Sequence, residues 1–316
     1  MVDVLIGLVP LMGVALWVFG WSALVQVGLC VLTCLAAEVA CSLIRKQPIP
    51  IGDYSIAVTG VILGLSLPWS APWYVPVIAS VVAVGLGKAV FGGLGYNIFN
   101  PAMVGRAFVM LSFARQMGAS AYVAAESKLT VVTEATPLSA AKEAIGQLIS
   151  GKVATLDGNE PLEKAGELVP LLLGQINGSL GETSAIAIII GGAYLCIRKV
   201  ASWQIPAGAI LATFVFAEVC QIIGLTPLSG LQHVLGGALL FGAFFIATDP
   251  VSSPLTSKGK FIFGIGTGLL VVLIRVFSGY PEGLMFAVLI MNACVPLINR
   301  WTIPTPLGGA LPEKKE

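Results

Sequence analysis

Apolar residues occur in long runs along this chain, separated by short connections that are polar or rich in glycine and proline. A helix needs about 20 apolar residues to cross a bilayer, and fewer when it is broken or its end is buried in protein. The pattern predicts ten such helices, at residues 4–19, 21–44, 54–67, 73–91, 102–111, 184–197, 205–223, 233–247, 263–277 and 283–298. We therefore expect an all-α integral membrane protein.

Residues 112–183 interrupt this pattern with the one stretch of soluble composition. A connection of this length is usually functional or has folded elements of its own. Alternating apolar and polar residues within it predict short surface helices at 138–149 and 161–173. The chain thus divides into a first membrane half (1–111), a cap segment (112–183), a second membrane half (184–300) and a tail (301–316).

Two connections inside the membrane halves, at 92–101 and 248–254, are rich in residues that break helices. Non-helical backbone is tolerated at membrane depth only where it lines a cavity or is buried in protein, so both connections are candidate binding sites. Five helices on each side of the cap, with a break in corresponding places, predict two inverted five-helix repeats, because an odd number of passages reverses the second copy.

Composition supports the membrane assignment and narrows the function. Of the 316 residues, 57% are hydrophobic and only 10% are charged, where a soluble chain has about 25%. The net charge is +1, and no basic cluster interleaved with aromatic residues is present, which excludes a nucleic-acid partner. Membrane lipid is the expected surrounding of most of the chain.

The distribution of lysine and arginine predicts the orientation, because basic residues are held on the cytoplasmic side. With the N-terminus inside, the short outer connections contain none, and residues 112–183 lie outside the cytoplasmic membrane. The inner connections, helix ends and tail then hold the following basic residues: Arg45, Lys46, Lys88, Arg198, Lys199, Lys258, Lys260, Arg300, Lys314 and Lys315. Both termini are expected in the cytoplasm.

The cap segment contains Thr136-Pro137-Leu138 at the start of its first predicted helix. Threonine is a common N-cap and proline favours the first helical position, so Thr136 could simply cap the helix. The same geometry would suit a phosphate joined to the Thr136 oxygen, because that phosphate would face free backbone amides at the positive end of the helix.

Several motifs in order resemble the D subunits of Rnf complexes, a family similar to the B subunit of the sodium-pumping NADH:quinone oxidoreductase (Nqr). The resemblance covers nearly the whole chain. The motifs are Gly64-Leu65-Ser66-Leu67-Pro68, Phe91-Gly92-Gly93-Leu94-Gly95-Tyr96-Asn97-Ile98-Phe99-Asn100-Pro101-Ala102, Ala135-Thr136-Pro137-Leu138, Gly181-Glu182-Thr183-Ser184, Ala247-Thr248-Asp249-Pro250-Val251-Ser252-Ser253-Pro254 and Tyr280-Pro281-Glu282-Gly283.

This resemblance implies that Thr136 carries FMN through a phosphoester bond installed by a separate flavin transferase. Glu134 departs from the family pattern, which usually has a small residue there, and its negative charge would repel the phosphate modestly if it points into water. The Nqr relative further implies a second, non-covalent flavin, riboflavin. The predicted orientation places Thr136 outside, where an exported transferase would act.

The resemblance also implies a role as one electron carrier in a complex that moves electrons between ferredoxin and NAD, coupled to Na⁺ or H⁺ transport across a bacterial or archaeal inner membrane. The chain shows no iron–sulfur cysteine pattern and no dinucleotide fingerprint. We therefore expect it to depend on the other Rnf subunits (A, B, C, E and G) and not to be catalytic alone.

Polar residues inside predicted helices are costly and commonly functional. Arg106 and Arg275 could contact flavin or its phosphate, or could pair with other groups of the helices. The carboxylates Glu38 and Glu218 could relay ions, or could lie at helix ends or subunit contacts.

Asp249 could cap a broken helix or bind a ligand, and Asn100 poses the same alternative. The single histidine, His233, begins a predicted helix and is expected at the membrane interface. No catalytic residue and no metal site is predicted.

Two other classes of function fit the same fold. Paired broken helices and inverted repeats are also typical of a channel or carrier for a small solute. A scaffold protein that has lost its flavin is a further alternative, motivated by Glu134. Bound flavin would distinguish the redox protein from both.

Overall fold

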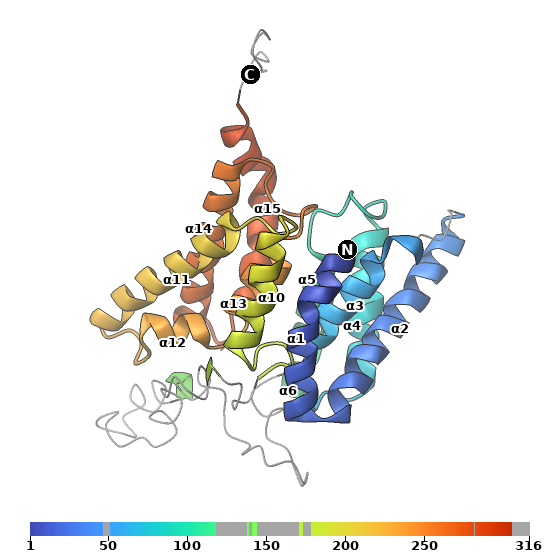
Figure 1. The fold of residues 1–316 in the computed structure, drawn as a ribbon, viewed down its shortest axis with the longest axis horizontal. Coiled ribbons are helices and arrows are strands. Elements are labelled where there is room, and N and C mark those ends of the chain that lie inside the picture. Colours follow the sequence, from blue (N-terminus) through green and yellow to red (C-terminus); the bar gives the residue numbers. More distant parts are fainter. Residues whose placement is uncertain are drawn as a thin grey trace.

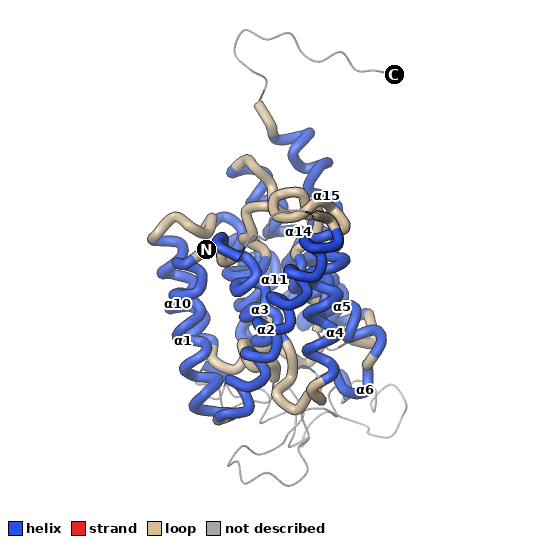
Figure 2. The backbone as a smooth tube through the Cα atoms, turned by 90° about the vertical axis from the view of Figure 1, so that its right-hand side faces the viewer, coloured by secondary structure: helices blue, strands red, loops and turns tan. Residues whose placement is uncertain are grey.

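The computed structural model describes residues 1–46, 51–117, 138, 141–143, 171–172, 178–280 and 282–304. These residues form helices and connections, and no strand occurs among them beyond an isolated bridge between Pro68 and Ser179 (Figure 2). The all-helical prediction is confirmed for this part of the chain.

Helices overlap all ten predicted ranges. The first half contains α1 (Val2–Phe19), α2 (Trp21–Ile44), α3 (Ser55–Ser66), α4 (Tyr74–Val84) continued by the π-helical turn η2 (Gly85–Ala89), α5 (Pro101–Ser112) and the short α6 (Ala114–Met117). The second half contains α10 (Ala185–Ile197), α11 (Gln204–Ile222), α12 (Gly230–Leu235), α13 (Leu239–Phe241), the π-helical turn η4 (Gly242–Ile246), α14 (Ser257–Phe277) and α15 (Leu284–Thr302). A 3₁₀ turn, η1 (Ile51–Asp53), precedes α3.

Five of these helices, α1, α2, α11, α14 and α15, are long and apolar enough to cross a membrane. The helices α3, α4 with η2, α5 and α10 are apolar but shorter. The eighth predicted span is divided among α12, α13 and η4, because Gly236 and Gly237 interrupt it; Gly237 has a φ of 69°, which favours glycine. His233 lies inside α12, which begins at Gly230, and its side chain is buried in the protein.

Local sequence explains where several helices begin. Asn100 caps α5 by accepting from the backbone of Ala102 and Met103, with Pro101 at the first helical position. Ser184 and Thr256 cap α10 and α14 in the same manner. Ser229 and Gln232 form a capping box at α12. These polar residues fix where the breaks between apolar helices fall.

The two ends of the molecule contain different helix ends and connections (Figure 1). At one end, here called the cap end, α5 ends and α10 begins. At the other, here called the terminal end, Met1 lies and α15 ends. Exposed tryptophans mark both, as aromatic belts do at the two surfaces of a bilayer: Trp17, Trp21 and Trp73 at the cap end, and Trp203 and Trp301 at the terminal end.

The two predicted breaks do not occupy corresponding places. Residues 90–100 separate the fourth and fifth helical elements of the first half, whereas residues 247–256 separate the third and fourth of the second half. The packing of the helices gives a different correspondence between the halves. The helix α2 packs on α3 and α4, and α11 packs on α12 and α14 in the same way, while α1 and α10 pack on each other between the halves. With α3 matched to α12 and α4 matched to α14, residues 247–256 correspond to the connection at 67–73, which follows α3.

Candidate functional site

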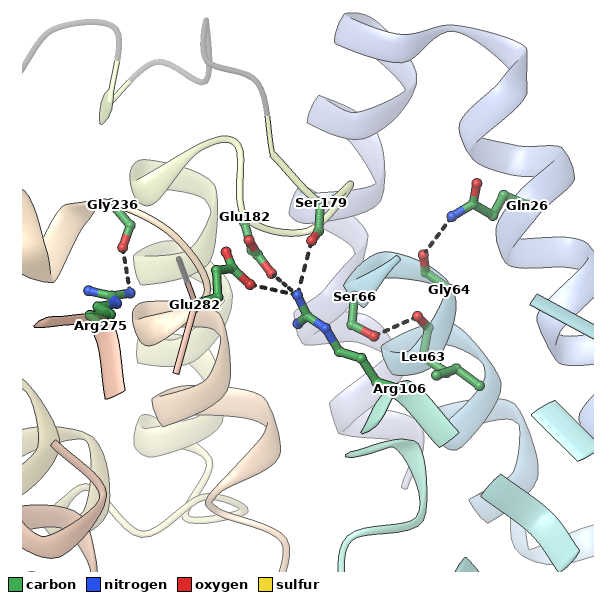
Figure 3. Close-up of polar contacts among 10 residues, drawn as sticks. All are labelled: Gln26, Leu63, Gly64, Ser66, Arg106, Ser179, Glu182, Gly236, Arg275 and Glu282. Carbon is green, nitrogen blue, oxygen red and sulfur yellow. Dashed lines mark hydrogen bonds and ion pairs between the residues drawn. The ribbon is translucent and has the colours of Figure 1, made fainter. Parts of the chain in front are cut away.

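Buried charges gather at the cap end around Arg106, which lies in the middle of α5. Its Nη2 atom donates to Glu182 Oε1 at 3.1 Å, to Glu282 Oε2 at 2.7 Å and to Ser179 Oγ at 3.3 Å (Figure 3). Glu182 precedes α10 and Glu282 precedes α15, so the cluster joins both halves of the membrane domain. We refer to these four residues as the cap-end cluster.

The end of α3 positions one side of this cluster. Leu67 precedes Pro68 and is extended, which ends the helix. The segment around Ser179 then lies along this end: the Gly181 N–H donates to the Leu65 carbonyl at 2.7 Å, and the Leu180 N–H donates to the Leu67 carbonyl. These bonds satisfy carbonyls that a helix end leaves free and hold Glu182 beside Arg106.

Arg275, near the end of α14, forms the other side of the site. Its guanidinium donates to the His233 carbonyl and, at 2.9 Å, to the Gly236 carbonyl, at the end of α12. Its Nε atom is buried and has no hydrogen-bond partner among the described residues. Arginine near the C-terminal carbonyls of a helix is electrostatically favourable, so Arg275 holds the broken passage in place.

The described residues of the cap segment contact this region directly. A side chain at Gly237 would lie 2.8 Å from Leu138 Cδ1, 3.0 Å from Arg275 Nη2 and 3.2 Å from Glu282 Oε1, so these three side chains meet at one point. Lys142 Nζ donates to the Arg275 carbonyl at 3.1 Å and to the Tyr280 carbonyl at 2.7 Å. The start of the predicted helix 138–149 is thus anchored on the second membrane half.

The carboxyl groups of Glu182 and Glu282 have opposite pKa shifts. Both lie in connections outside the membrane-spanning helices. Burial, followed by the negative charge of Glu282, raises the pKa of Glu182 well above 4.5. Burial also acts to raise the pKa of Glu282, but Arg106, a hydrogen bond from Glu182 and Arg275 together lower it.

A second group of polar residues lines a cavity of about 190 Å³ at the terminal end. Lys88, in η2, is buried and forms an ion pair with Glu38 at 2.8 Å and a hydrogen bond to Ser55 Oγ at 3.1 Å. Both π-helical turns contribute to the cavity, through Lys88 of η2 and Phe245 of η4; such turns frequently occur at functional sites.

Amide and carboxyl side chains from the two predicted breaks meet at this cavity. The Asn100 amide donates to the Ile246 carbonyl at 3.4 Å, which joins α5 to η4. Asn292, with its amide nitrogen facing the Ser252 carbonyl, donates to it at 3.0 Å and accepts from the Asn100 N–H at 3.1 Å. Asp249 accepts from the Val251 N–H and the Ser252 hydroxyl, so it caps the turn that follows η4.

The structure thus separates the predicted site residues into two groups. Arg106 and Arg275 lie at the cap end, and Asn100, Asp249 and Glu38 lie at or beside the terminal-end cavity. Glu218 is apart from both and accepts from the Gly230 N–H at 2.9 Å, at the start of α12. Thr136 and Glu134 lie outside the described residues.

Four charged residues of these sites are absent from the set predicted from sequence: Lys88, Lys142, Glu182 and Glu282. The count of basic residues assigns Lys88 to an inner helix end, although its position in an apolar run is itself a signal of a buried charge. Glu182 and Glu282 are each part of a motif that carries the family resemblance. Nothing in the sequence marks Lys142 as a site residue beyond its place on a predicted surface helix.

Apolar helices, tryptophans at both ends and a buried charge cluster between the halves define a multi-pass helical membrane protein. The chain belongs to the NQR2, RnfD, RnfE family, whose model matches residues 1–308. This confirms the resemblance inferred from the motifs.

Several curated relatives cover nearly the whole chain. It is 39% identical to the D subunit of the Na(+)-translocating ferredoxin:NAD(+) oxidoreductase complex of Acetobacterium woodii, over 96% of this chain and 88% of the relative. It is 38% identical to the D subunit of the proton-translocating ferredoxin:NAD(+) oxidoreductase complex of Clostridium ljungdahlii, over 97% and 90%. The D subunit of an ion-translocating oxidoreductase complex of Actinobacillus succinogenes is 37% identical, over 98% and 94%. Each of these relatives is one part of a larger complex.

Proposed function

We propose that this chain is the flavin-carrying subunit of an ion-translocating ferredoxin:NAD⁺ oxidoreductase (Rnf) complex, with FMN attached to Thr136 through a phosphoester bond. A bound flavin supplies the capacity to accept and donate electrons. The chain's own part is to hold and orient it, while the other subunits (A, B, C, E and G) supply the remaining carriers. Coupling to Na⁺ or H⁺ is supported by relatives named for each ion.

One observation carries this proposal: the anchoring of Leu138 beside Arg275 and Glu282. Thr136 is two residues before Leu138, and two residues of chain span at most about 7 Å. A phosphate on Thr136 would therefore be tethered close to a region that contains two arginines and Lys142. The unpartnered Nε donor of Arg275 fits an anionic ligand.

The test is in-gel flavin fluorescence of the denatured protein after co-expression with a flavin transferase. Wild type should fluoresce, Thr136→Ala should be dark, and Thr130→Ala, at a nearby threonine outside the attachment motif, should fluoresce as wild type does. A dark wild type, with a transferase shown to act on another substrate, would remove the covalent flavin and favour a solute carrier or a flavin-free scaffold.

The terminal-end cavity is proposed to hold the second, non-covalent flavin, riboflavin. Its walls include the apolar side chains of Val58, Ile62 and Phe245, which suit a flat aromatic ring. Polar groups at the edge include Asp249 and the buried Asn97, whose Oδ1 atom has no hydrogen-bond partner in the part of the chain that the structure describes. Such an acceptor would take an N–H of the ring.

Acid extraction distinguishes this second flavin from the first. Acid should release riboflavin from wild type and from Thr136→Ala. Asn97→Leu should release none, although its in-gel fluorescence from the covalent flavin should be that of wild type. Asn299→Ala is the matched control, because Asn299 bonds the Leu255 N–H and does not line the cavity. Equal riboflavin release from Asn97→Leu and wild type would contradict this site.

We further infer ten passages in two inverted repeats, with both termini in the cytoplasm and residues 112–183 outside a bacterial or archaeal inner membrane. The matched packing of α2 and α11 supports this. Glu38 is paired with Lys88 beside Ser55, the first residue of α3, and Glu218 bonds Gly230, the first residue of α12. Alkaline phosphatase, which is active only outside, should be active when fused after residue 116 and inactive after residue 199.

A further inference from the structure

The cap-end cluster contains two carboxyl groups that share one guanidinium nitrogen. Arg106 Nη2 is 3.1 Å from Glu182 Oε1 and 2.7 Å from Glu282 Oε2, so both carboxyl groups lie against the same nitrogen. Arg275 uses its described hydrogen bonds on backbone carbonyls. Two carboxylates this close repel strongly when both are ionised, because burial excludes the water that would screen them.

Glu182 Oε2 shows which group holds a proton. This atom is buried and receives no hydrogen bond from any donor in the described structure. An ionised oxygen in that position would lose its hydration without compensation, which is costly. A protonated oxygen would instead donate to the neighbouring carboxylate of Glu282, which satisfies both groups.

We propose that Glu182 and Glu282 form an acid–carboxylate pair that binds one exchangeable proton at the cap end of the molecule. Glu182 is the acid and donates to Glu282, and Glu282 is the carboxylate that neutralises Arg106. No bond other than O–H changes when the proton moves. Transfer from Glu182 to Glu282 leaves the pair with one negative charge, whereas release of the proton to water leaves it with two.

Exposure supports exchange with water through Glu282. Its side chain is 21% exposed, whereas that of Glu182 is 2% exposed, so a proton reaches Glu182 by way of its partner. With the proton bound, Arg106, Arg275 and the pair carry a net charge of +1, which would complement an anionic group held by the cap segment.

The groups that face the pair come from every element around it. Arg106 belongs to α5, Arg275 to α14 and Ser179 to the segment before α10. From α12, His233 contributes its backbone carbonyl to Arg275. From the cap segment, Lys142 is anchored on the Arg275 and Tyr280 carbonyls. The cations outnumber the anions once one carboxyl is protonated.

Infrared spectroscopy of the purified full chain in detergent, prepared without flavin transferase, tests this pair whether or not the flavin proposal holds. At neutral pH, the difference between wild type and Glu182→Gln should show the loss of one carboxylic acid C=O band that shifts in D₂O. Glu38→Gln is the matched control, because Glu38 is paired with Lys88; it should remove a carboxylate band and keep the acid band.

Glu282→Gln provides the reciprocal test. Glu182 should then become the only carboxylate beside Arg106 and ionise, so the acid band should disappear although Glu182 is still present. The proposal is overturned if Glu182→Gln removes carboxylate bands in place of the acid band, or if Glu282→Gln leaves the acid band unchanged. If Glu182→Gln does not fold, Glu282→Gln still decides between these outcomes.

Discussion

At the scale of single residues, the clearest feature is the different treatment of buried charge at the two ends. Lys88 and Glu38 form a one-to-one pair at the terminal end, with side chains that are 5% and 7% exposed. At the cap end, Arg106 serves two carboxyl groups, one of which is expected to be neutral. The terminal-end pair has one cation for each anion. Arg106 is shared by two carboxyl groups, so we expect the net charge of the cap-end cluster to change with pH.

Removing one partner of the terminal-end pair should be strongly destabilising. Lys88→Met leaves the Glu38 carboxylate buried without its cation, and breaking a buried pair in this manner costs about 3–5 kcal/mol. The double variant Lys88→Met/Glu38→Leu should recover most of that loss. Thermal unfolding in detergent measures both, and an additive double variant would contradict the pairing.

Glu182 should make stability depend on pH. Because burial raises its pKa above 4.5, the folded chain binds this proton more tightly than the unfolded chain does. The free energy of unfolding should therefore fall as pH rises from about 4.5 towards the raised pKa. Glu182→Gln is neutral at every pH, so its unfolding temperature should lack this fall, whereas Glu38→Gln should retain it.

At the scale of elements, close helix contacts explain why α3 fits against α2. A side chain at Gly60 would lie 2.7 Å from Val31 Cα, and one at Gly64 would lie 2.8 Å from Val27 Cα. Small residues four apart let two helices approach closely in a membrane. This contact sets the position of the end of α3, and hence that of Glu182.

Gly64→Ala should therefore separate α3 from α2. Overpacking of this kind costs about 1–3 kcal/mol, and the unfolding temperature should fall. Gly13→Ala is the matched control within α1, because its added methyl group would meet no atom of the other described helices within 4 Å. That variant should be neutral or slightly stabilising, since alanine favours helix over glycine.

Hydropathy identifies helices within all ten ranges, because the length of an apolar run is a local property of the sequence. Many of the residues that these helices contact are far away in the sequence. Arg106 contacts Glu182 and Glu282, which are 76 and 176 residues away, and no spacing rule relates such positions. The motifs contain these glutamates without assigning them a role. The prediction that the two breaks occupy corresponding places is wrong because it compares only the composition of two connections. The correspondence between the halves depends on which helices pack together.

At the scale of the whole molecule, the cap segment is attached to the second membrane half through Lys142. Its ammonium group bonds two backbone carbonyls at the end of α14, and burial lowers its pKa. Leu138 adds an apolar contact with Ala141 and Leu228. These contacts cross the boundary between the soluble and the membrane parts of the chain.

Lys142→Met should loosen this attachment and increase the rate at which a protease cleaves the cap segment of the folded protein. Glu143→Gln is the matched control, because Glu143 is adjacent and exposed, and it should be cleaved at the wild-type rate. Equal cleavage of Lys142→Met and wild type would show that Leu138 and its apolar neighbours hold the segment without the lysine.

The anchor of Lys142 also has a consequence for biosynthesis. Lys142 bonds carbonyls that lie 133 and 138 residues further along the chain. A ribosome that has just completed the cap segment has not yet made its binding surface, which exists only after α14 and the turn beyond it have been inserted. The growing chain therefore passes through a stage in which Lys142 has been made but has no docking surface. The proposed attachment of FMN to Thr136 would have this interval in which to take place.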